Sequence, residues 1–383
     1  MSVHAAAFSR RMPGMLSRRS FLGYAAAGVA AGATPTLLHG WSPEPRRGKA
    51  DAENGPIHLN SNENAYGAFP SVIALPNPFL DANRYPFRAD EQLAESIAAK
   101  HKVKPEQVLL GCGSTETIKI AVAAFTSPSR KLVMAAPTFE AAEMHARANG
   151  APVDHVPLTA NYAHDLDAML KAAEGAGLVY ICNPNNPTAS LTPRSDLEKF
   201  VASLPQDTAV LMDEAYHDFV PAGANYRSFL DSPVGSPQLI VARTFSKIYG
   251  MAGLRLGYGI ASPDMIERMR NQSQSDSINI FAIRCALAAL ADESAHSHAV
   301  ARNATDRSEF MKQCAARNVT AIPSATNFVM IETGHPVRKV IEHFRTHNVL
   351  VGRPFPPYDT KLRVSLGRPA EMQSFWRAWD ALS

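Results

Sequence analysis

The sequence has few cysteines, and it lacks the features that several classes of protein need. Its 383 residues include 4 cysteines with no CxxC pair, which excludes a zinc ribbon and makes a disulfide scaffold improbable. No apolar run reaches the roughly 20 residues that a membrane-spanning helix needs. The net charge is only +3, without the basic excess of a nucleic-acid binder. We therefore expect neither nucleic acid nor membrane as a partner of the mature chain.

The first residues have the composition of an export signal. Ser17–Leu22 places two arginines before Phe-Leu, and a mildly apolar run from Tyr24 to Ala33 follows, ending in small residues. This pattern resembles the twin-arginine (Tat) signal, so we expect a signal peptide over 1–33, export by the Tat machinery and a periplasmic or extracellular location. The alternative is an Ala-rich leader in which the arginines occur by chance. Residues 34–56, rich in Pro, Gly and charge, are predicted to be a flexible lead-in.

Short apolar runs recur along the middle of the chain, with helical patterns such as 140–149 and 193–203 between them. The last three runs begin about thirty residues apart, which is the length of one βαβ unit. With 46% hydrophobic and 19% charged residues, the composition is that of a globular protein. We predict an α/β fold with a mostly parallel, doubly wound sheet covered by helices on both faces. Its expected strands are Lys131–Ala136, Leu178–Cys182, Ala209–Met212 and Leu239–Ala242.

Polar groups follow three of these expected strands. Asn183–Thr188 follows the second strand, Asp213–Tyr216 the third and Arg243–Lys247 the fourth. Ligands of such sheets bind beyond the carboxyl ends of the strands. An amide, a carboxylate and an amine should therefore meet at one edge of the sheet and form a site.

Asp213 and Lys247 alone are compatible with several kinds of site. They could form a plain buried salt bridge, because a carboxylate at the end of an apolar strand needs a cation to stay ionised. A nucleotide hydrolase that holds Mg²⁺ on 213–215 would need a GxxxxGK[ST] loop, which the sequence lacks. A dinucleotide site at 111–113 fails because the third glycine position of GxGxxG is Glu116.

Pyridoxal phosphate (PLP) accounts for more of these residues. A lysine can form a Schiff base with its aldehyde, and a carboxylate can hold its pyridine nitrogen protonated. The loop 111–116 precedes a helical pattern at 117–125, so its N–H groups can bind a phosphate at a helix start. Ser246 and Arg255 can supply a hydroxyl and a positive charge to the same phosphate.

The order and spacing of these motifs resemble the fold type I PLP-dependent aminotransferases, within the histidinol-phosphate aminotransferase group. The resemblance runs from about Ile57 to the end, with weaker matches at 59–67, 84–86 and 363–367. It implies an N-terminal arm over 57–85, a large PLP-binding domain over 86–280, and a small α+β domain formed by 281–383 with the arm. It also implies a homodimer with shared active sites, because Tyr85 should reach the cofactor phosphate of the neighbouring subunit.

The resemblance assigns a role to each matched residue. Lys247 is the catalytic Schiff-base lysine, and Arg363 should bind the substrate α-carboxylate. Arg353 could hold a second anionic group or form an exposed salt bridge. Asn64 and Tyr66 should lie near the substrate. The remaining cofactor-binding residues are Gly113, Ser114, Thr115, Phe139, Asn186, Asp213, Tyr216, Ser246 and Arg255.

The expected reaction moves an amino group between an L-amino acid and a 2-oxo acid with ping-pong kinetics. Ala65 and Ala68 stand where the family usually has proline, which puts the substrate in doubt. An exported enzyme would rarely meet histidinol phosphate, so we expect another amino acid, aromatic or basic. The alternatives are a histidinol-phosphate aminotransferase, a PLP decarboxylase or lyase, and a non-catalytic PLP-binding protein. No metal is expected, since His296 and His298 lie in a polar helical stretch.

Overall fold

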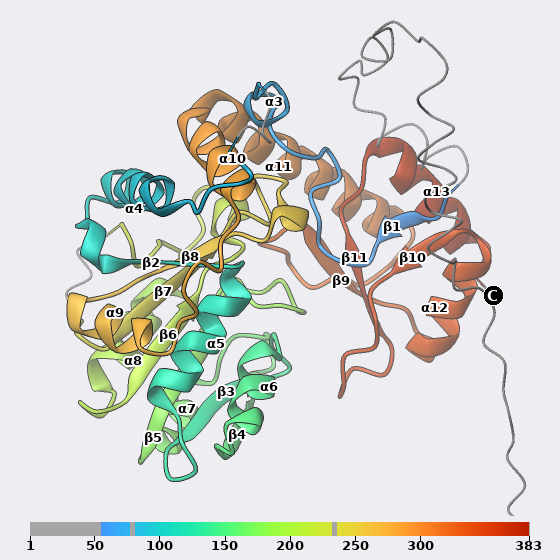
Figure 1. The fold of residues 1–383 in the computed structure, drawn as a ribbon. Helices are drawn as coiled ribbons and strands as arrows, with labels where there is room; N and C mark the ends of the chain where they lie inside the picture. Colours follow the sequence, from blue (N-terminus) through green and yellow to red (C-terminus); the bar gives the residue numbers. More distant parts are fainter. Residues whose placement is uncertain (1–54, 77–80, 232–235, 383) are drawn as a thin grey trace, which may run out of the picture. The chain divides into compact units, whose positions relative to one another are not determined.

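A seven-stranded sheet forms the larger part of the protein in a computed structural model that describes residues 55–76, 81–231 and 236–382 (Figure 1). The predicted signal peptide and most of the lead-in lie outside the described residues. The strand order is β2-β8-β7-β6-β5-β3-β4, and β8 alone runs antiparallel to its neighbours. The strands are β2 (Val108–Gly111), β3 (Lys131–Ala136), β4 (Val153–Pro157), β5 (Ala176–Cys182), β6 (Ala209–Asp213), β7 (Leu239–Thr244) and β8 (Gly257–Ile260).

Helices cover both faces of this sheet, and β5 shows why its sequence reads as one continuous apolar run. Leu178 and Tyr180 point to one face while Val179 and Ile181 point to the other, and all seven residues of β5 are buried. The first face packs against α5 (Ser114–Phe125), α6 (Ala141–Ala148) and α9 (Pro263–Arg270). The second packs against α4 (Phe87–His101), α7 (Leu166–Ala172), α8 (Arg194–Ser203) and α10 (Ile280–Ala291). The predicted α/β doubly wound architecture is confirmed.

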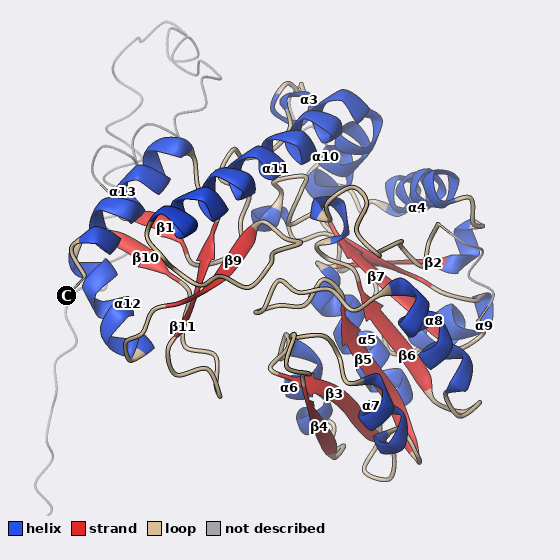
Figure 2. Ribbon diagram, turned by 180° about the vertical axis from the view of Figure 1, so that it is seen from behind, coloured by secondary structure: helices blue, strands red, loops and turns tan. Residues whose placement is uncertain are grey.

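A smaller α+β part follows (Figure 2). It has a hydrophobic core of its own around Phe310, Phe344 and Phe375. The 24-residue helix α11 (Glu293–Ala316) runs from α10 towards it. Its strands β9 (Phe328–Glu332) and β11 (Lys361–Ser365) pair antiparallel, and β10 (Val349–Val351) pairs parallel with β1 (Ile57–Leu59). Helices α12 (Val337–Thr346) and α13 (Pro369–Asp380) cover these strands, and α3 (Pro70–Ile73) lies within the arm. The exact domain boundaries stay a prediction.

The described ranges lack two features that other classes of protein show. No helix there combines the length and the apolar character that crossing a bilayer requires. Nor do those ranges bring three or more His, Cys, Asp or Glu side chains together as a metal site would.

Candidate active site

A cavity of about 480 Å³ lies beyond the carboxyl ends of the parallel strands, where the sequence places the site. Its size is typical of a small-molecule pocket. Most of the predicted residues line it together: Ser114, Thr115, Phe139, Asn186, Asp213, Tyr216, Ser246, Lys247, Arg255, Arg353 and Arg363. Asn186, Asp213 and Lys247, at or just after the ends of β5, β6 and β7, meet because these strands are neighbours in the sheet.

Lys247 follows β7 and brings its amine into this cavity. The Nζ atom donates to the backbone carbonyl of Asn62 at 3.1 Å. Burial, together with the nearby charge of Arg363, lowers the pKa of Lys247 to about 8. A sizeable fraction of the amine is therefore neutral near pH 8, which is the form that attacks an aldehyde or accepts a proton.

Asp213 ends β6 and is only 2% exposed. One carboxylate oxygen, Oδ2, accepts a hydrogen bond from the Tyr180 hydroxyl at 2.7 Å, and Oδ1 accepts from the Ala215 amide at 3.1 Å. Burial raises the pKa of Asp213 to about 6, so the group is ionised at neutral pH and above. A buried carboxylate of this kind can keep a pyridine nitrogen protonated.

The start of α5 provides an anion site opposite this carboxylate. Gly113 caps the helix with a φ of +78°, a conformation that favours glycine, and a Cβ there would collide with the Arg255 guanidinium. Nη1 of Arg255 donates to Oγ of Ser246 at 3.3 Å. Free N–H groups at a helix start, a guanidinium and hydroxyls fit a phosphate.

Arg363 lies on β11, across the cavity from the sheet, and donates to two protein acceptors. Nη1 reaches Oδ1 of Asn186 at 2.7 Å, and Nη2 reaches the carbonyl of Asn60 at 2.7 Å. Burial lowers its pKa to about 10, so it stays charged at pH 7. Its Nε is buried and has no hydrogen-bond partner in the described chain. A guanidinium with a donor still unused fits a substrate carboxylate.

The structure also brings residues into the site that no sequence motif had indicated. Asn62, on the arm, donates from Nδ2 to the Tyr216 hydroxyl at 3.1 Å, and its backbone N–H donates to Oγ of Ser365 at 2.9 Å. Asn62 therefore joins the arm, the sheet end and β11 around the cavity. Its place in the matched segment 59–64 was the only signal for it. Tyr180 was missed because a tyrosine in a buried strand reads as core.

Three predicted residues lie elsewhere in this chain. Tyr66 and Asn64 line a second cavity of about 490 Å³ on the other side of the arm, where the Tyr66 hydroxyl donates to Asp306 at 3.1 Å. Tyr85 is 73% exposed and stacks on Phe87, with ring centroids 5.7 Å apart. Their roles toward substrate and a partner's phosphate stay predictions.

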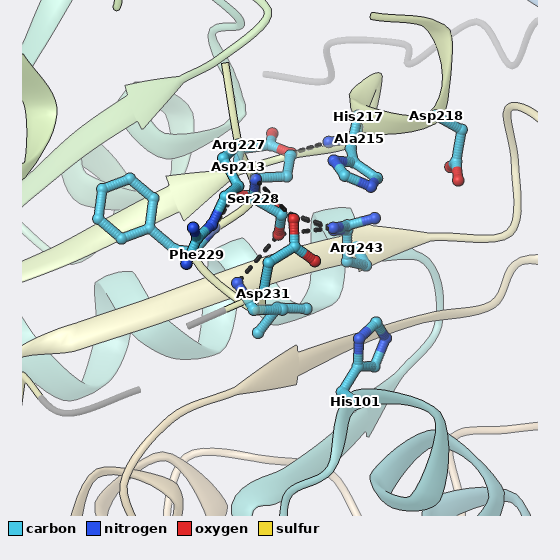
Figure 3. A network of polar contacts seen from close by, with 12 residues as sticks. His101, Asp213, Ala215, His217, Asp218, Arg227, Ser228, Phe229, Asp231 and Arg243 are labelled. Carbon is cyan, nitrogen blue, oxygen red and sulfur yellow. Dashed lines mark hydrogen bonds and ion pairs between the residues drawn. The ribbon is translucent and has the colours of Figure 1, made fainter. Parts of the chain in front are cut away.

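A buried ion pair connects the ends of β6 and β7 next to the cavity (Figure 3). Arg243, on β7, lies 2.9 Å from Oε2 of Glu214, which directly follows β6. Oγ of Ser228 donates to the same Oε2 at 2.6 Å, and the N–H of Phe229 donates to Oε1 at 2.9 Å. This network links the chain after Asp213 to the strand that leads to Lys247.

These residues fit PLP. Lys247 would hold the aldehyde carbon, Asp213 the ring nitrogen, Asn186 and Tyr216 the phenolic oxygen, and Phe139 the ring face. Ser114, Thr115, Ser246 and Arg255 would hold the phosphate. When bound, the cofactor supplies an electron-withdrawing ring that stabilises the electron pair left on the substrate Cα. The fold and the site together define a PLP-dependent enzyme of fold type I.

Comparison with known proteins supports this class and identifies a family within it. The family described as aminotransferase class I and II matches residues 54–378. A histidinol-phosphate aminotransferase of Shouchella clausii is 35% identical over 83% of this chain and 87% of its own. An aromatic amino acid aminotransferase of Cutibacterium acnes is 32% identical over 88% and 94%. The crystal structure of histidinol-phosphate aminotransferase from Sinorhizobium meliloti with pyridoxal-5'-phosphate shares the fold, with a TM-score of 0.79 at 24% identity over 93% and 100%.

The chain belongs to the class I and II aminotransferases, and its cofactor is pyridoxal 5'-phosphate. Three side chains of the site would have separate roles in amino transfer. With the cofactor and donor bound, Nζ of Lys247 would take the proton from the donor Cα. The charge of Asp213 would keep the ring nitrogen protonated, and Arg363 would orient the donor through its α-carboxylate.

Proposed function

We propose that this aminotransferase takes its amino group from an L-amino acid with an aromatic side chain and gives it to a 2-oxo acid. Arg363 would bind the α-carboxylate. The observation that carries the proposal is an ion pair between Arg353 and Glu140, both of which line the cavity. Because Glu140 neutralises this second arginine, the site disfavours a second anionic group. The ring of Phe355 lines the same cavity next to Arg353 and suits an aromatic side chain.

Histidinol phosphate is the second candidate. Arg353 and Arg363 line one cavity, so Arg353 could hold a phosphate group if it left Glu140. The two side chains of the ion pair are 51% and 45% exposed, which makes the pair easy to break. Relatives at 35% identity that carry this activity support the candidate.

A panel of amino donors tests the proposal. With 2-oxoglutarate or pyruvate as acceptor, we expect kcat/KM for phenylalanine and tyrosine to exceed that for aspartate and histidinol phosphate. Glu140→Gln should then raise the relative kcat/KM for the two donors with an extra anionic group by about threefold, because a half-exposed ion pair is worth less than ~1 kcal/mol. Steady-state rates with each donor measure both effects.

Glu143→Gln is the matched control. Glu143 lies one helical turn further along, pairs with Arg147 and His155, and does not line the cavity. It should leave the donor preference unchanged. Histidinol phosphate as the best donor of the wild-type enzyme would overturn the proposal in favour of the second candidate.

We further propose that the enzyme works as a homodimer in which Tyr85 completes the partner's phosphate site. The exposure of Tyr85 and of Phe87, at 73% and 61%, supports an interface there. Mixing Lys247→Ala and Tyr85→Ala subunits should restore activity in the heterodimer, since one of its two sites is then intact. A PLP-loaded, active monomer would contradict this proposal.

We propose export by the Tat pathway on the basis of Arg18 and Arg19 before Phe-Leu. A twin-arginine signal suits a protein that acquires its cofactor before transport. The full chain with Arg18→Lys and Arg19→Lys should stay in the cytoplasmic fraction, while the unaltered chain reaches the periplasm or medium. Equal distribution of the two would refute the proposal.

A further inference from the structure

Tyr180 is a fully buried side chain at the centre of the sheet, and it contacts a group of the active site. It lies on β5 opposite Leu211 of β6, two residues before the point where Cys182 faces Asp213. Alternation along the two strands directs Tyr180 and Asp213 to the same face, so they are diagonal neighbours. The phenol spans this diagonal and donates to Oδ2 of Asp213 at 2.7 Å.

The surroundings of Asp213 make this donor important. Among the described residues, the nearby charges are Lys247, which favours the charge of the carboxylate, and Glu214, which opposes it. The Cys182 thiol and the Tyr216 hydroxyl also lie close to Asp213. Burial raises the pKa of Asp213, whereas the hydrogen bonds from Tyr180 and the Ala215 amide lower it. The amide is fixed by the backbone. The Tyr180 hydroxyl is therefore a side-chain donor that can be removed without changing the strand.

We propose that Tyr180 is a positioning residue for the cofactor: its hydroxyl keeps Asp213 ionised and oriented toward the ring nitrogen of PLP. A proton shared between the carboxylate and the ring nitrogen lies on the nitrogen when the carboxylate is the weaker base. A hydrogen bond from Tyr180 weakens that base. Without it, the proton moves from the ring nitrogen to Oδ of Asp213, and no other proton enters or leaves.

The test uses protein loaded with ¹⁵N-labelled PLP. We expect the ring ¹⁵N resonance of the wild type to have the chemical shift of a protonated pyridine at pH 8. In Tyr180→Phe it should move toward the unprotonated value, and the rate of the first half-reaction should fall about tenfold, as for a lost hydrogen bond to a charge. The readout does not depend on which amino acid is the donor.

Tyr258→Phe is the matched control, because Tyr258 is also buried in the sheet but its hydroxyl contacts His101 at 2.9 Å, not Asp213. It should leave the ¹⁵N shift unchanged. If Tyr180→Phe also keeps the wild-type shift, Tyr180 only fills the core and the proposal is wrong. Should that variant fail to fold, 3-fluorotyrosine at position 180, a stronger donor of the same shape, must keep the ring nitrogen protonated to a higher pH than in the wild type when the ¹⁵N shift is followed as the pH is raised; deprotonation at the same or a lower pH overturns the proposal.

Discussion

Replacing Lys247 with Ala should abolish amino transfer in both half-reactions while the protein still binds PLP. We expect this amine to move the proton at the donor Cα, and removing a positioned proton-transfer group costs up to about 10⁴-fold. The side chains expected to bind the phosphate, Ser114, Ser246 and Arg255, line the cavity and are unchanged in this variant, so cofactor binding should persist. Single-turnover absorbance changes after mixing with an amino donor at pH 8 measure the loss.

Hydride reduction provides an independent readout of the same variant. Borohydride treatment should attach the cofactor to the peptide that contains Lys247 in the wild type and to no peptide of Lys247→Ala. Lys199→Ala, on the exposed side of α8, should behave as the wild type in both measurements. A Lys247→Ala protein that transfers amino groups at the wild-type rate would show that the catalytic assignment is wrong.

The groups around the sheet end were predictable because a simple rule places them. Buried parallel strands read as continuous apolar runs, and polar residues that directly follow such runs meet at one edge of the sheet. Asp213 and Lys247 follow from this rule, and so does a helix after the glycine-rich loop 111–116, although α5 begins at Ser114, three residues before the predicted 117. The predicted strand 131–136 matches β3, and the predicted helix 193–203 matches α8.

What the sequence missed depends on side-chain direction and on pairing between distant segments. Asn62 reaches Ser365 across 303 positions and Tyr216 across 154, and no local pattern encodes such contacts. β1 has only three residues, too few for a recognisable strand pattern, and it is a strand because it pairs with β10. The side of the arm that Tyr66 faces was also not predictable, because it depends on a contact with Asp306, 240 positions away.

The ion pair behind the site gives the second large effect, on stability. Arg243→Met should lower the free energy of unfolding by about 3–5 kcal/mol, because it leaves the buried carboxylate of Glu214 without its cation. Urea unfolding of the cofactor-free protein at pH 7.5 measures the change. Arg147→Met, which removes an exposed pair with Glu143 on α6, should cost less than about 1 kcal/mol.

A double variant distinguishes two causes of this stability loss, the uncompensated charge of Glu214 and the lost packing of the Arg243 side chain. Adding Glu214→Gln to Arg243→Met removes the uncompensated charge. The amide oxygen can still accept from the Phe229 N–H, and the amide NH2 can donate to Oγ of Ser228, which then accepts instead of donating, so much of the stability should return. If the double variant is no more stable than Arg243→Met, the loss comes from packing instead. Because the network joins the ends of β6 and β7, Arg243→Met should also loosen the positions of Asp213 and Lys247 and weaken PLP binding, an effect that the Arg147 control must not show.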